Sequence, residues 1–338
     1  ENYSFVVQDA VQGYYWDNSQ ATLHPLVAYY RKGDGSLGTI NFCVVSDCLK
    51  HDATAVYAFL SVIIAHLKKL IPGLSLVRYF SDGAASQYKN CKNFLNLCYH
   101  EENFAVKAEW HFFATSHGKS PCDGIGGTIK RLVARASLQA TTGNHILNAK
   151  ELFSWAKANI SGIEMLFVSG EEIEKCEKNL ESRLSTSKTI AGRRSHHSFV
   201  PISSDSLKIR RISSDKDGIS VKVTSLSRTI ASESFTPGQF VAAAYDKAWY
   251  LGVVEDVSQE NEDVLVNFMR SRNAGTTIHS FVWPSTRDEC WIPFDHVLSS
   301  VPEPLQVTGG RVKQYKLSTP AIQMIEASFK KFLDCYCN

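Results

Sequence analysis

Two aspartates in the first half of the chain have the setting that metal-dependent phosphodiester chemistry requires. Asp82 follows the apolar run 74–80 and precedes Gly83, which places it at the C-terminal tip of an expected strand. Asp123 follows the aromatic run 105–114 and opens an expected helix. Two carboxylates at the ends of neighbouring elements can share Mg²⁺ or Mn²⁺, and two such ions about 3.5–4 Å apart clamp the attacking and leaving oxygens of a phosphodiester. The pair therefore predicts a catalytic metal site whose substrate is a nucleic acid.

Each of these residues also has an ordinary structural alternative. Asp82 before Gly83 is typical of a turn, and Asp123 can simply cap its helix. Lys130 comes seven residues after Asp123, two helical turns on and on the same face. Lys130 and Arg131 could contact DNA phosphates there, or they could form an ordinary solvated helix face. Both readings stay open at this point.

Further candidates for phosphate contacts lie in the segments around the two aspartates. Lys89 follows Asp82, and His117 and Lys119 sit in the loop before Asp123; loop polarity alone also explains the last two. Glycine in a helix costs about 1 kcal/mol relative to alanine, yet three glycines crowd the start of the helix that Asp123 opens. We therefore expect a close approach there, either by a DNA backbone or by the underlying sheet, at Gly124, Gly126 and Gly127.

A net charge of +2 hides an uneven distribution. Residues 183–228 hold ten lysines or arginines against three aspartates. A basic, serine-rich stretch of this kind suits phosphate contacts, although it could equally be a solvated linker. The candidate DNA-binding residues within it are Arg193, Arg194, Arg210 and Arg211.

The order of periodic segments predicts an α/β fold around these residues. An opening strand and two strands joined by the turn 32–35 come first, followed by a helix over 53–70. Strand, helix, strand and helix then alternate over 74–80, 84–99, 105–114 and 123–139. Three strands followed by this alternation is the order of an RNase H-like domain: a mixed sheet with helices on both faces and the carboxylates near strand tips.

The remainder of the chain predicts three further regions. Two helices over 150–181 complete a core of residues 1–182, the second beginning with a capping box of Ser169 and Glu172. Residues 183–236 read as the basic linker. Five short strands with turn residues between them predict a small β-barrel over 237–300, and 301–338 is a tail of unclear docking.

Aromatic residues are dense in the expected barrel. Tyr245, Trp249, Tyr250 and Trp283 could form a cage that holds a methylated ammonium by cation–π attraction. Small barrels also fill their interiors with aromatic rings, so core packing is the alternative. Alternation along a strand puts Trp249 and Tyr250 on opposite faces, which lets at most one of them join a cage.

Composition narrows the class of protein. The chain has 338 residues with 44% hydrophobic and 21% charged, enough for roughly two ordinary cores. The longest apolar run, 56–67, is too short to span a bilayer, and no targeting segment is visible. Nine cysteines without regular spacing favour a reducing compartment. A start without methionine suggests a fragment.

Two long motifs carry a family resemblance. The blocks are FSDGAASQYKN and EWHFFATSHGKSPCDGIGGTIKR, together with the opening ENY, QATLHPLVAYY and VVSDCLKHD. They resemble transposon-encoded proteins widespread in animal genomes, whose core looks like a DDE/D transposase. The segment GQFVAAAYDKAWYLGVVEDV is similar to the Tudor-like C-terminal module of the same proteins.

The resemblance implies a nuclear enzyme that acts on DNA with Mg²⁺ or Mn²⁺. Strands would be attacked first by water and then by a 3′-hydroxyl, and a homo-oligomer and a histone-tail or other protein partner for the barrel are further expectations. Glu1-Asn2-Tyr3 matches the end of the family's first strand motif, so the first catalytic aspartate is expected three positions before Glu1. The alternative is a catalytically inactive DNA- or chromatin-binding protein that retains the fold.

Overall fold

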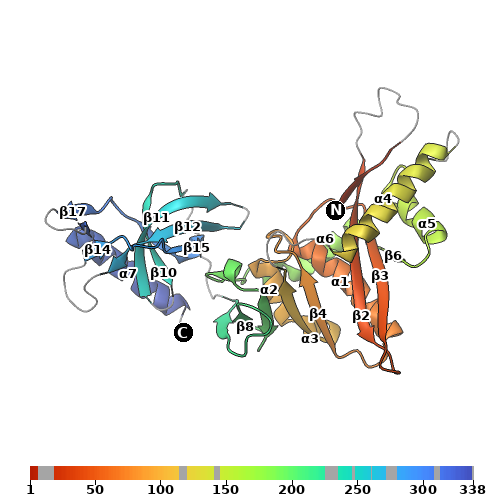
Figure 1. Cartoon of the computed structure of the whole chain (residues 1–338), viewed down its shortest axis with the longest axis horizontal. Helices are drawn as coiled ribbons and strands as arrows, with labels where there is room; N and C mark the ends of the chain where they lie inside the picture. The colour runs from red at the N-terminus through yellow and green to blue at the C-terminus, as the bar shows by residue number, and fades with distance from the viewer. Residues whose placement is uncertain are drawn as a thin grey trace. The chain divides into compact units, whose positions relative to one another are not determined.

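The computed structural model describes residues 1–6, 19–113, 120–140, 145–224, 235–245, 248–259, 261–271, 280–307 and 313–336. These residues form a mixed α/β protein with several sheets and seven α-helices (Figure 1). The chain divides into two compact units, each described by itself below. The first comprises Glu1–Gly83, Tyr99–Ala108 and Phe112–Ser182, and the second comprises Ala84–Cys98, Glu109–His111 and Arg183–Asn338.

The first sheet has the strand order β1-β2-β3-β6. The strands β1, β2 and β3 pair antiparallel, and β6 joins β3 in parallel. The predicted hairpin turn is confirmed: Gly35 has a φ of 81°, and the Ser36 amide donates to Asp34 Oδ1. The bounds are β1 Asn2–Ser4, β2 Gln20–Arg31, β3 Leu37–Ser46 and β6 Glu164–Phe167.

Helix α1 (Ala53–Leu70) covers one face of this sheet. It begins where the Asp52 side chain accepts the amides of Thr54 and Ala55, as a helix-start aspartate should. Its Phe59 ring lies 5.0 Å from the ring of His24 on β2. By length and composition α1 could cross a membrane, but 56% of the helix is buried inside the protein. Its packing is that of a core helix.

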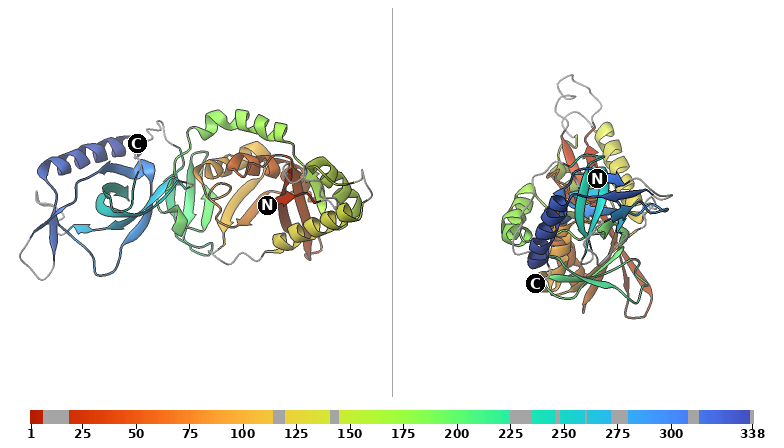
Figure 2. Two further views of the ribbon diagram at one scale, coloured as in Figure 1. Left: turned by 90° about the horizontal axis from the view of Figure 1, so that it is seen from above. Right: turned by 90° about the vertical axis from the view of Figure 1, so that its left-hand side faces the viewer.

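The opposite face of the sheet is covered by α4 (Pro121–Gln139) and α5 (Ala149–Asn159). Leu23 of β2 packs in one cluster with Ile129 of α4 and Leu152 of α5. Since Leu23 and His24 are consecutive, alternation sends them to opposite faces. Helices on both faces are thus confirmed, and Figure 2 shows these layers from a second direction.

Helix α6 (Gly170–Leu184) completes the first unit's helical cover. Its predicted capping box is confirmed, because the amide of Ser169 donates to Glu172 Oε2 and the amide of Glu172 donates to Ser169 Oγ. The strand β6, which lies between α5 and α6, was not predicted from the sequence. Its four residues are too few to show a period.

Strands β4 (Leu76–Ser81) and β5 (Lys107–Phe112) are neighbours in a different sheet from β1–β3, which corrects the expectation of a single mixed sheet. The Lys107 amide donates to Ser75 O and the Phe113 amide to Ser81 O, each at 2.9 Å. These bonds advance in the same direction along both strands, as in a parallel pair. The ends of both strands that precede the two aspartate-bearing segments therefore lie together.

The helix expected over 84–99 is shorter than predicted. The described helices are α2 (Cys91–Cys98) and α3 (His100–Phe104). Asn90 accounts for the late start, because its Oδ1 accepts the amide of Asn93 while its amide group donates to Ala85 O. A side chain that bonds the backbone locally favours a cap over a helix interior.

In the second unit, part of the expected linker is a sheet. Three antiparallel strands, β7 (Ser198–Pro201), β8 (Ser206–Arg210) and β9 (Ile219–Lys222), continue from β5. This corrects the linker expectation over these residues. Apolar side chains of β7 and β8 are buried, including Phe199 and Leu207 at 0% exposure. Residues 225–234 of that expected linker lie outside the described part.

The expected barrel region contains a five-stranded sheet in the order β15-β12-β11-β10-β16. Three of its strands match predicted ones, but the predicted strand at 280–285 lies in another sheet, and the predicted strand over 289–298 is divided into β15 and β16. Over the described residues this sheet does not close into a barrel, so the expectation of a closed barrel is wrong for this part of the chain. Four short strands form a second sheet, β13-β14-β18-β17. The five strands are β10 Phe240–Tyr245, β11 Ala248–Ser258, β12 Asp263–Phe268, β15 Glu289–Pro293 and β16 Val297–Ser300, and the four are β13 Arg270–Ser271, β14 Ser280–Val282, β17 Leu305–Val307 and β18 Gln314–Lys316.

The expected tail is largely a docked helix, α7 (Thr319–Tyr336). Ala321 and Ile325, one turn apart, pack in a cluster with Ala242 of β10 and Leu251 of β11. Neighbouring β10 residues, Val241 and Ala243, face a separate cluster. The sheet is therefore buried on both faces, and α7 supplies one of those covers.

Candidate functional site

Asp82 lies where the sequence predicts, directly after the last residue of β4, and its side chain is exposed. The ladder with β5 reaches this point, since the Phe113 amide donates to Ser81 O. Ser81 Oγ also donates to the carbonyl of Asp82 at 2.8 Å. The strand tip next to Asp82 is thereby fixed by main-chain and side-chain bonds.

Asp123 stands in the first turn of α4, the helix that follows β5. Its Oδ2 accepts the Ser120 amide at 2.9 Å, within a reciprocal capping box. Asp123 therefore caps its helix, which was the structural alternative to metal binding. A carboxylate has two oxygens and about four lone-pair sites, so this bond leaves acceptor capacity at Asp123 for a cation.

Glu1 is a carboxylate that the sequence did not single out. It pairs with Lys130 of α4, whose Nζ donates to Glu1 Oε2. A Cβ placed on Gly126 would lie 3.1 Å from Glu1 Oε1. Gly126 is thus approached by a side chain of this chain, which explains one of the three glycines. Nothing in a lone glutamate at the start of a strand could have predicted this contact.

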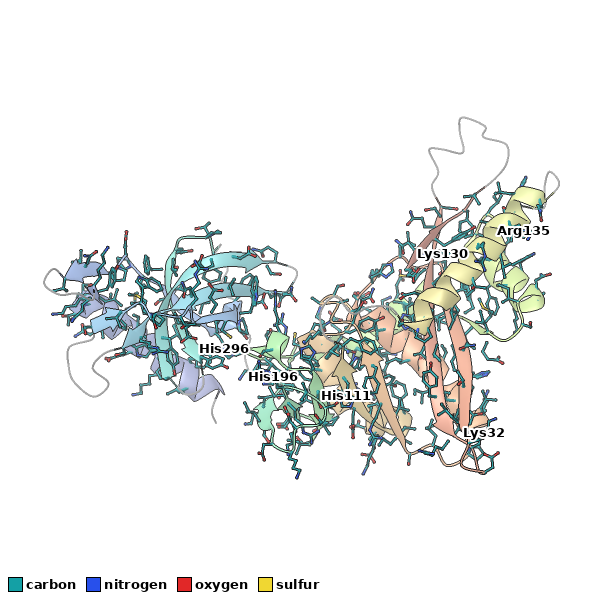
Figure 3. The ribbon with its side chains drawn as sticks, in the orientation of Figure 1. Lys32, His111, Lys130, Arg135, His196 and His296 are labelled. Carbon is teal, nitrogen blue, oxygen red and sulfur yellow. The ribbon has the colours of Figure 1, made fainter. Side chains whose placement is uncertain are left out.

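The other two helix glycines face open space. A Cβ at Gly124 or at Gly127 would meet no atom of the described residues within 4 Å, and both glycines are exposed. Arg131, also exposed, follows Gly127 by one turn, and Arg135 follows one turn later. Figure 3 shows Lys130 and Arg135 on α4. The start of α4 therefore combines bare, accessible backbone with cations further along the helix.

An exposed aromatic pair adjoins Asp82. The rings of Phe80 and Phe113 are stacked, with centroids 6.3 Å apart and an interplanar angle of 29°. Phe80 is 57% exposed and Phe113 is 40% exposed. Tyr79 points the other way and is buried, with its hydroxyl 2.8 Å from His100 Nε2. Tyr79 and Phe80 are consecutive in a strand, so alternation could have predicted that one of the two rings is exposed; this signal in the sequence was not used.

Three of the expected phosphate-binding cations are engaged inside the second unit. Arg194 forms two hydrogen bonds to the Asp263 carboxylate, Nη2 to Oδ1 at 2.7 Å and Nε to Oδ2 at 3.1 Å. Arg193 is 4% exposed and lies 3.5 Å from the same carboxylate. Lys89 donates to the carbonyl of Arg194 at 3.0 Å. We call Lys89, Arg193, Arg194 and Asp263 the ionic cluster.

Three members of the ionic cluster are buried, and the fourth, Arg194, is half-buried. Asp263 is 1% exposed, and the guanidinium of Arg194 lies over the ring of Trp291 with Cζ 3.6 Å from its centroid. Burial, reinforced by Arg193 and Arg194, lowers the pKa of Lys89 to about 8. These contacts give the three cations a role in joining β11–β12 to residues 193–195, which the sequence did not predict.

The remaining basic candidates are more accessible. Arg211 is exposed and Arg210 is half-buried at the end of β8. Lys130 is half-buried in its ion pair with Glu1, and Arg131 is exposed. His117 and Lys119 lie outside the described residues. Among the described candidates, Arg131 and Arg211 therefore present their side chains most openly to a polyanion.

The candidate aromatic cage is not assembled as one group. Trp249 and Trp283 pack against the cluster that contains Phe281, whereas Tyr250 stacks edge-on against Phe268 of the other cluster. The Tyr245 hydroxyl lies near Gly192, 3.5 Å from the position of its added Cβ. Opposite faces for Trp249 and Tyr250 were predicted, and core packing accounts for both tryptophans.

The metal expectation can be compared with the donors present. Among the described residues, no group of three or more His, Cys, Asp and Glu side chains stands ready to hold a metal ion. Asp82 and Asp123 are exposed oxygen donors at strand and helix ends, and Mg²⁺ is usually bound by one or two carboxylates with water and substrate phosphates completing its shell. The donor chemistry fits, and a metal shared by both aspartates stays a prediction.

Comparison with known proteins adds one family. A family model described as a domain of unknown function (DUF8701) matches residues 1–213, which is more than half of the chain. No curated protein and no solved structure matches. The matched stretch contains both aspartates, the exposed aromatic pair and three members of the ionic cluster, but not Asp263 or the sheet that carries it.

Proposed function

The chain belongs to the DUF8701 family, and we propose that this domain is the RNase H-like core of a DDE/D-type transposase that cleaves and joins DNA strands with Mg²⁺ or Mn²⁺. The fold order supports the proposal. Three antiparallel strands, a helix, and two parallel strands that alternate with helices follow one another between residues 1 and 139. Helices lie on both faces of the first sheet.

The observation that carries the proposal is the position of Asp82 and Asp123. Asp82 ends β4, and Asp123 lies in the first turn of the helix after β5, its parallel neighbour. In open α/β sheets, ligands bind outside the carboxyl ends of the strands. Asp82 lies at the carboxyl end of β4, Asp123 opens the helix that follows β5, and both are exposed; the proposal brings both carboxylates to that edge. A phosphodiester at this edge would meet acidic groups that repel it unless a cation intervenes, so the arrangement calls for a metal ion.

Asp82 and Asp123 would hold the metal, which when bound polarises a phosphoryl oxygen and lowers the pKa of a water. The chain's own residues then position the substrate. The exposed backbone at Gly124 and Gly127 lets a phosphate reach the N-terminal turns of α4, where amide groups and the helix dipole favour anions. Arg131 and Arg135 continue that surface along the helix.

A second candidate function is a DNA- or chromatin-binding protein that retains the fold without catalysis. The observation that favours it is the capping role of Asp123, whose Oδ2 is committed to the Ser120 amide. An aspartate kept only for its cap needs no metal. Nuclear localisation and a protein partner for the C-terminal region are compatible with both functions.

The test is nicking of supercoiled DNA by the full chain in Mg²⁺ or Mn²⁺. Asp82→Asn and Asp123→Asn each remove a charge, and asparagine at 123 can still accept the Ser120 amide, so the fold is kept. We expect both variants to lose cleavage by at least about 100-fold, on the scale of other essential catalytic groups. Asp217→Asn, an exposed change in a loop, should cleave like the parent.

The outcomes separate the two functions. Metal-dependent cleavage that both variants abolish supports the transposase proposal. Cleavage that persists in both variants contradicts the assignment of the site. DNA binding without cleavage, unchanged in the two variants, favours the non-catalytic alternative.

A further inference from the structure

We propose that Phe80 and Phe113 form a stacking platform for an unpaired nucleobase beside Asp82, so that the preferred substrate carries a single-stranded or extruded nucleotide next to the cleaved bond. The inference rests on the proposed nucleic-acid chemistry and adds the class of substrate to it. The first observation is the solvent exposure of the two rings. Full burial of a phenylalanine side chain is worth about 1.5–3 kcal/mol, yet Phe80 is 57% exposed and Phe113 is 40% exposed.

The two rings are arranged as one surface. They come from neighbouring strand ends, held in register by the Phe113 amide bond to Ser81 O. Their centroids are 6.3 Å apart and their planes differ by 29°. Neither ring carries a polar group, so water gains no hydrogen bond from the exposure. A flat apolar surface of this kind matches the π-face that every nucleobase offers.

The position relative to Asp82 decides what the surface would hold. Phe80 lies on the exposed face of β4, and Asp82 directly follows the strand two residues later, about 7 Å further along an extended chain. Arg78, exposed and two residues before Phe80, leaves that face as well. A backbone phosphate at Asp82 therefore places its own or the adjoining base over the rings. The row of cation, aromatic and carboxylate is the pattern of a strand-tracking nucleic-acid surface.

A paired base is excluded from this contact by its own stacking. Bases in a duplex are covered above and below, and enzymes that need one must extrude it or act on single strands, at a cost of a few kcal/mol. Two exposed rings at the reaction edge offset part of that cost. The pair thus favours ends with an unpaired flank over blunt duplex.

Binding is measured by fluorescence anisotropy with the full chain in Ca²⁺ and three labelled DNAs: a blunt duplex, the same duplex with a single-stranded flank, and the flank alone. Stacking is worth about 1–3 kcal/mol per base, which is about 5- to 150-fold in affinity. We expect the parent to prefer the flanked duplex, and Phe80→Leu, Phe113→Leu and the double variant to lose that preference by this factor. Blunt-duplex affinity should stay unchanged. Phe80→Tyr should retain the preference.

The leucine variants keep an apolar side chain, so the fold should be preserved. As a control, Tyr29→Ala removes a comparably exposed ring, at 58%, from β2. Equal affinity of parent and leucine variants for the flanked DNA overturns the platform, as does a parent without preference for unpaired nucleotides or without DNA binding. Loss of preference in Tyr29→Ala also contradicts it. A parent that does not bind DNA would contradict the proposed function as well. Cleavage that depends on Asp82 can survive each of the other results, so a failed platform is distinguishable from a failed catalytic assignment.

Discussion

A buried lysine shows how strongly single residues in this protein depend on their neighbours. Lys89 is 7% exposed, donates to the carbonyl of Arg194 and faces the charges of Arg193 and Arg194. Burial and these two arginines all disfavour its positive charge, and the carboxylate of the ionic cluster, Asp263, is hydrogen-bonded by Arg194. Lys89 is therefore held where its charged form is destabilised.

The lowered pKa of Lys89 predicts a pH dependence of stability. Burial first, then the two arginines, holds the folded pKa at about 8, below the usual value of 10.5. Between these values the unfolded chain binds more protons, so raising the pH through this window stabilises the fold. Below pH 8 the cost of the charge is fully present.

The measurement is the free energy of unfolding by denaturant for the parent and Lys89→Met at pH 7.5 and pH 10. The parent should gain stability relative to the variant as the pH rises. A difference that stays constant, or that moves in the opposite direction, contradicts a lowered pKa. Using the difference between the two proteins cancels the other groups that titrate in this range.

At the scale of elements, α4 is less stable than a helix of its length could be. Gly124 and Gly127 face open space, whereas Gly126 faces the Glu1 carboxylate. Each helix glycine costs about 1 kcal/mol relative to alanine. Among the described residues, a contact explains the glycine at Gly126 alone, and we propose that the exposed backbone at the other two positions serves a ligand.

The variant Gly124→Ala/Gly127→Ala should therefore be more stable and less functional. We expect its free energy of unfolding to rise by about 1–2 kcal/mol, while DNA affinity and cleavage fall because two methyl groups stand where the phosphate approaches. Gly126→Ala is the matched control and should gain less, since the Glu1 side chain must move. A double variant that is stabilised and keeps full DNA affinity would show that the glycines have no role in binding.

The ionic cluster makes a second prediction about elements. Arg194→Ala removes both hydrogen bonds to Asp263, which is 1% exposed, and uncovers the Trp291 ring. A broken buried pair typically costs 3–5 kcal/mol; because Arg193 remains nearby, we expect about 3 kcal/mol. Arg211→Ala, an exposed change in the same region, should alter stability by less than about 0.5 kcal/mol. Equal effects of the two changes in denaturant unfolding would contradict the structural role of Arg194.

For the whole molecule, DNA binding should be salt-sensitive and largely independent of sequence. Arg193 and Arg194 serve the fold, so the accessible cations of the same region carry this prediction: Arg211, Lys216 and Lys222 are all exposed. Their combined change to alanine should reduce the slope of log affinity against log salt by about 0.9 for each duplex phosphate that the variant no longer neutralises. An unchanged slope would remove this region from the DNA-binding surface.

Much of the fold can be predicted from local sequence, and the elements that were not predicted have physical reasons for it. The hairpin at Gly35, the helix beginning after Asp52 and the capping box of Ser169 and Glu172 depend on neighbours within four residues, so they were predictable. The strands β7–β9 were not predicted because each has only four or five residues, too few to show a period, although Phe199 is fully buried. β7 also pairs with β5, which lies far away in the sequence.

In the candidate site, too, local features were predictable and long-range contacts were not. The positions of Asp82 and Asp123 at element ends follow from local pattern, whereas the contact of Glu1 with Lys130 joins residues 129 apart in the chain. The pairing of Arg194 with Asp263 joins residues 69 apart. Local pattern carries no signal for such pairs, and a basic stretch reads the same whether its arginines face solvent or a buried carboxylate.

The central claim, that Asp82 and Asp123 hold a metal ion, is tested most directly by calorimetric titration of the full chain with Mn²⁺. We expect saturable binding by the parent, its loss in Asp82→Asn/Asp123→Asn, and its retention in Asp215→Asn/Asp217→Asn, which removes the same charge from the loop between β8 and β9. Binding of Mn²⁺ by Asp82→Asn/Asp123→Asn with the affinity and stoichiometry of the parent would contradict it.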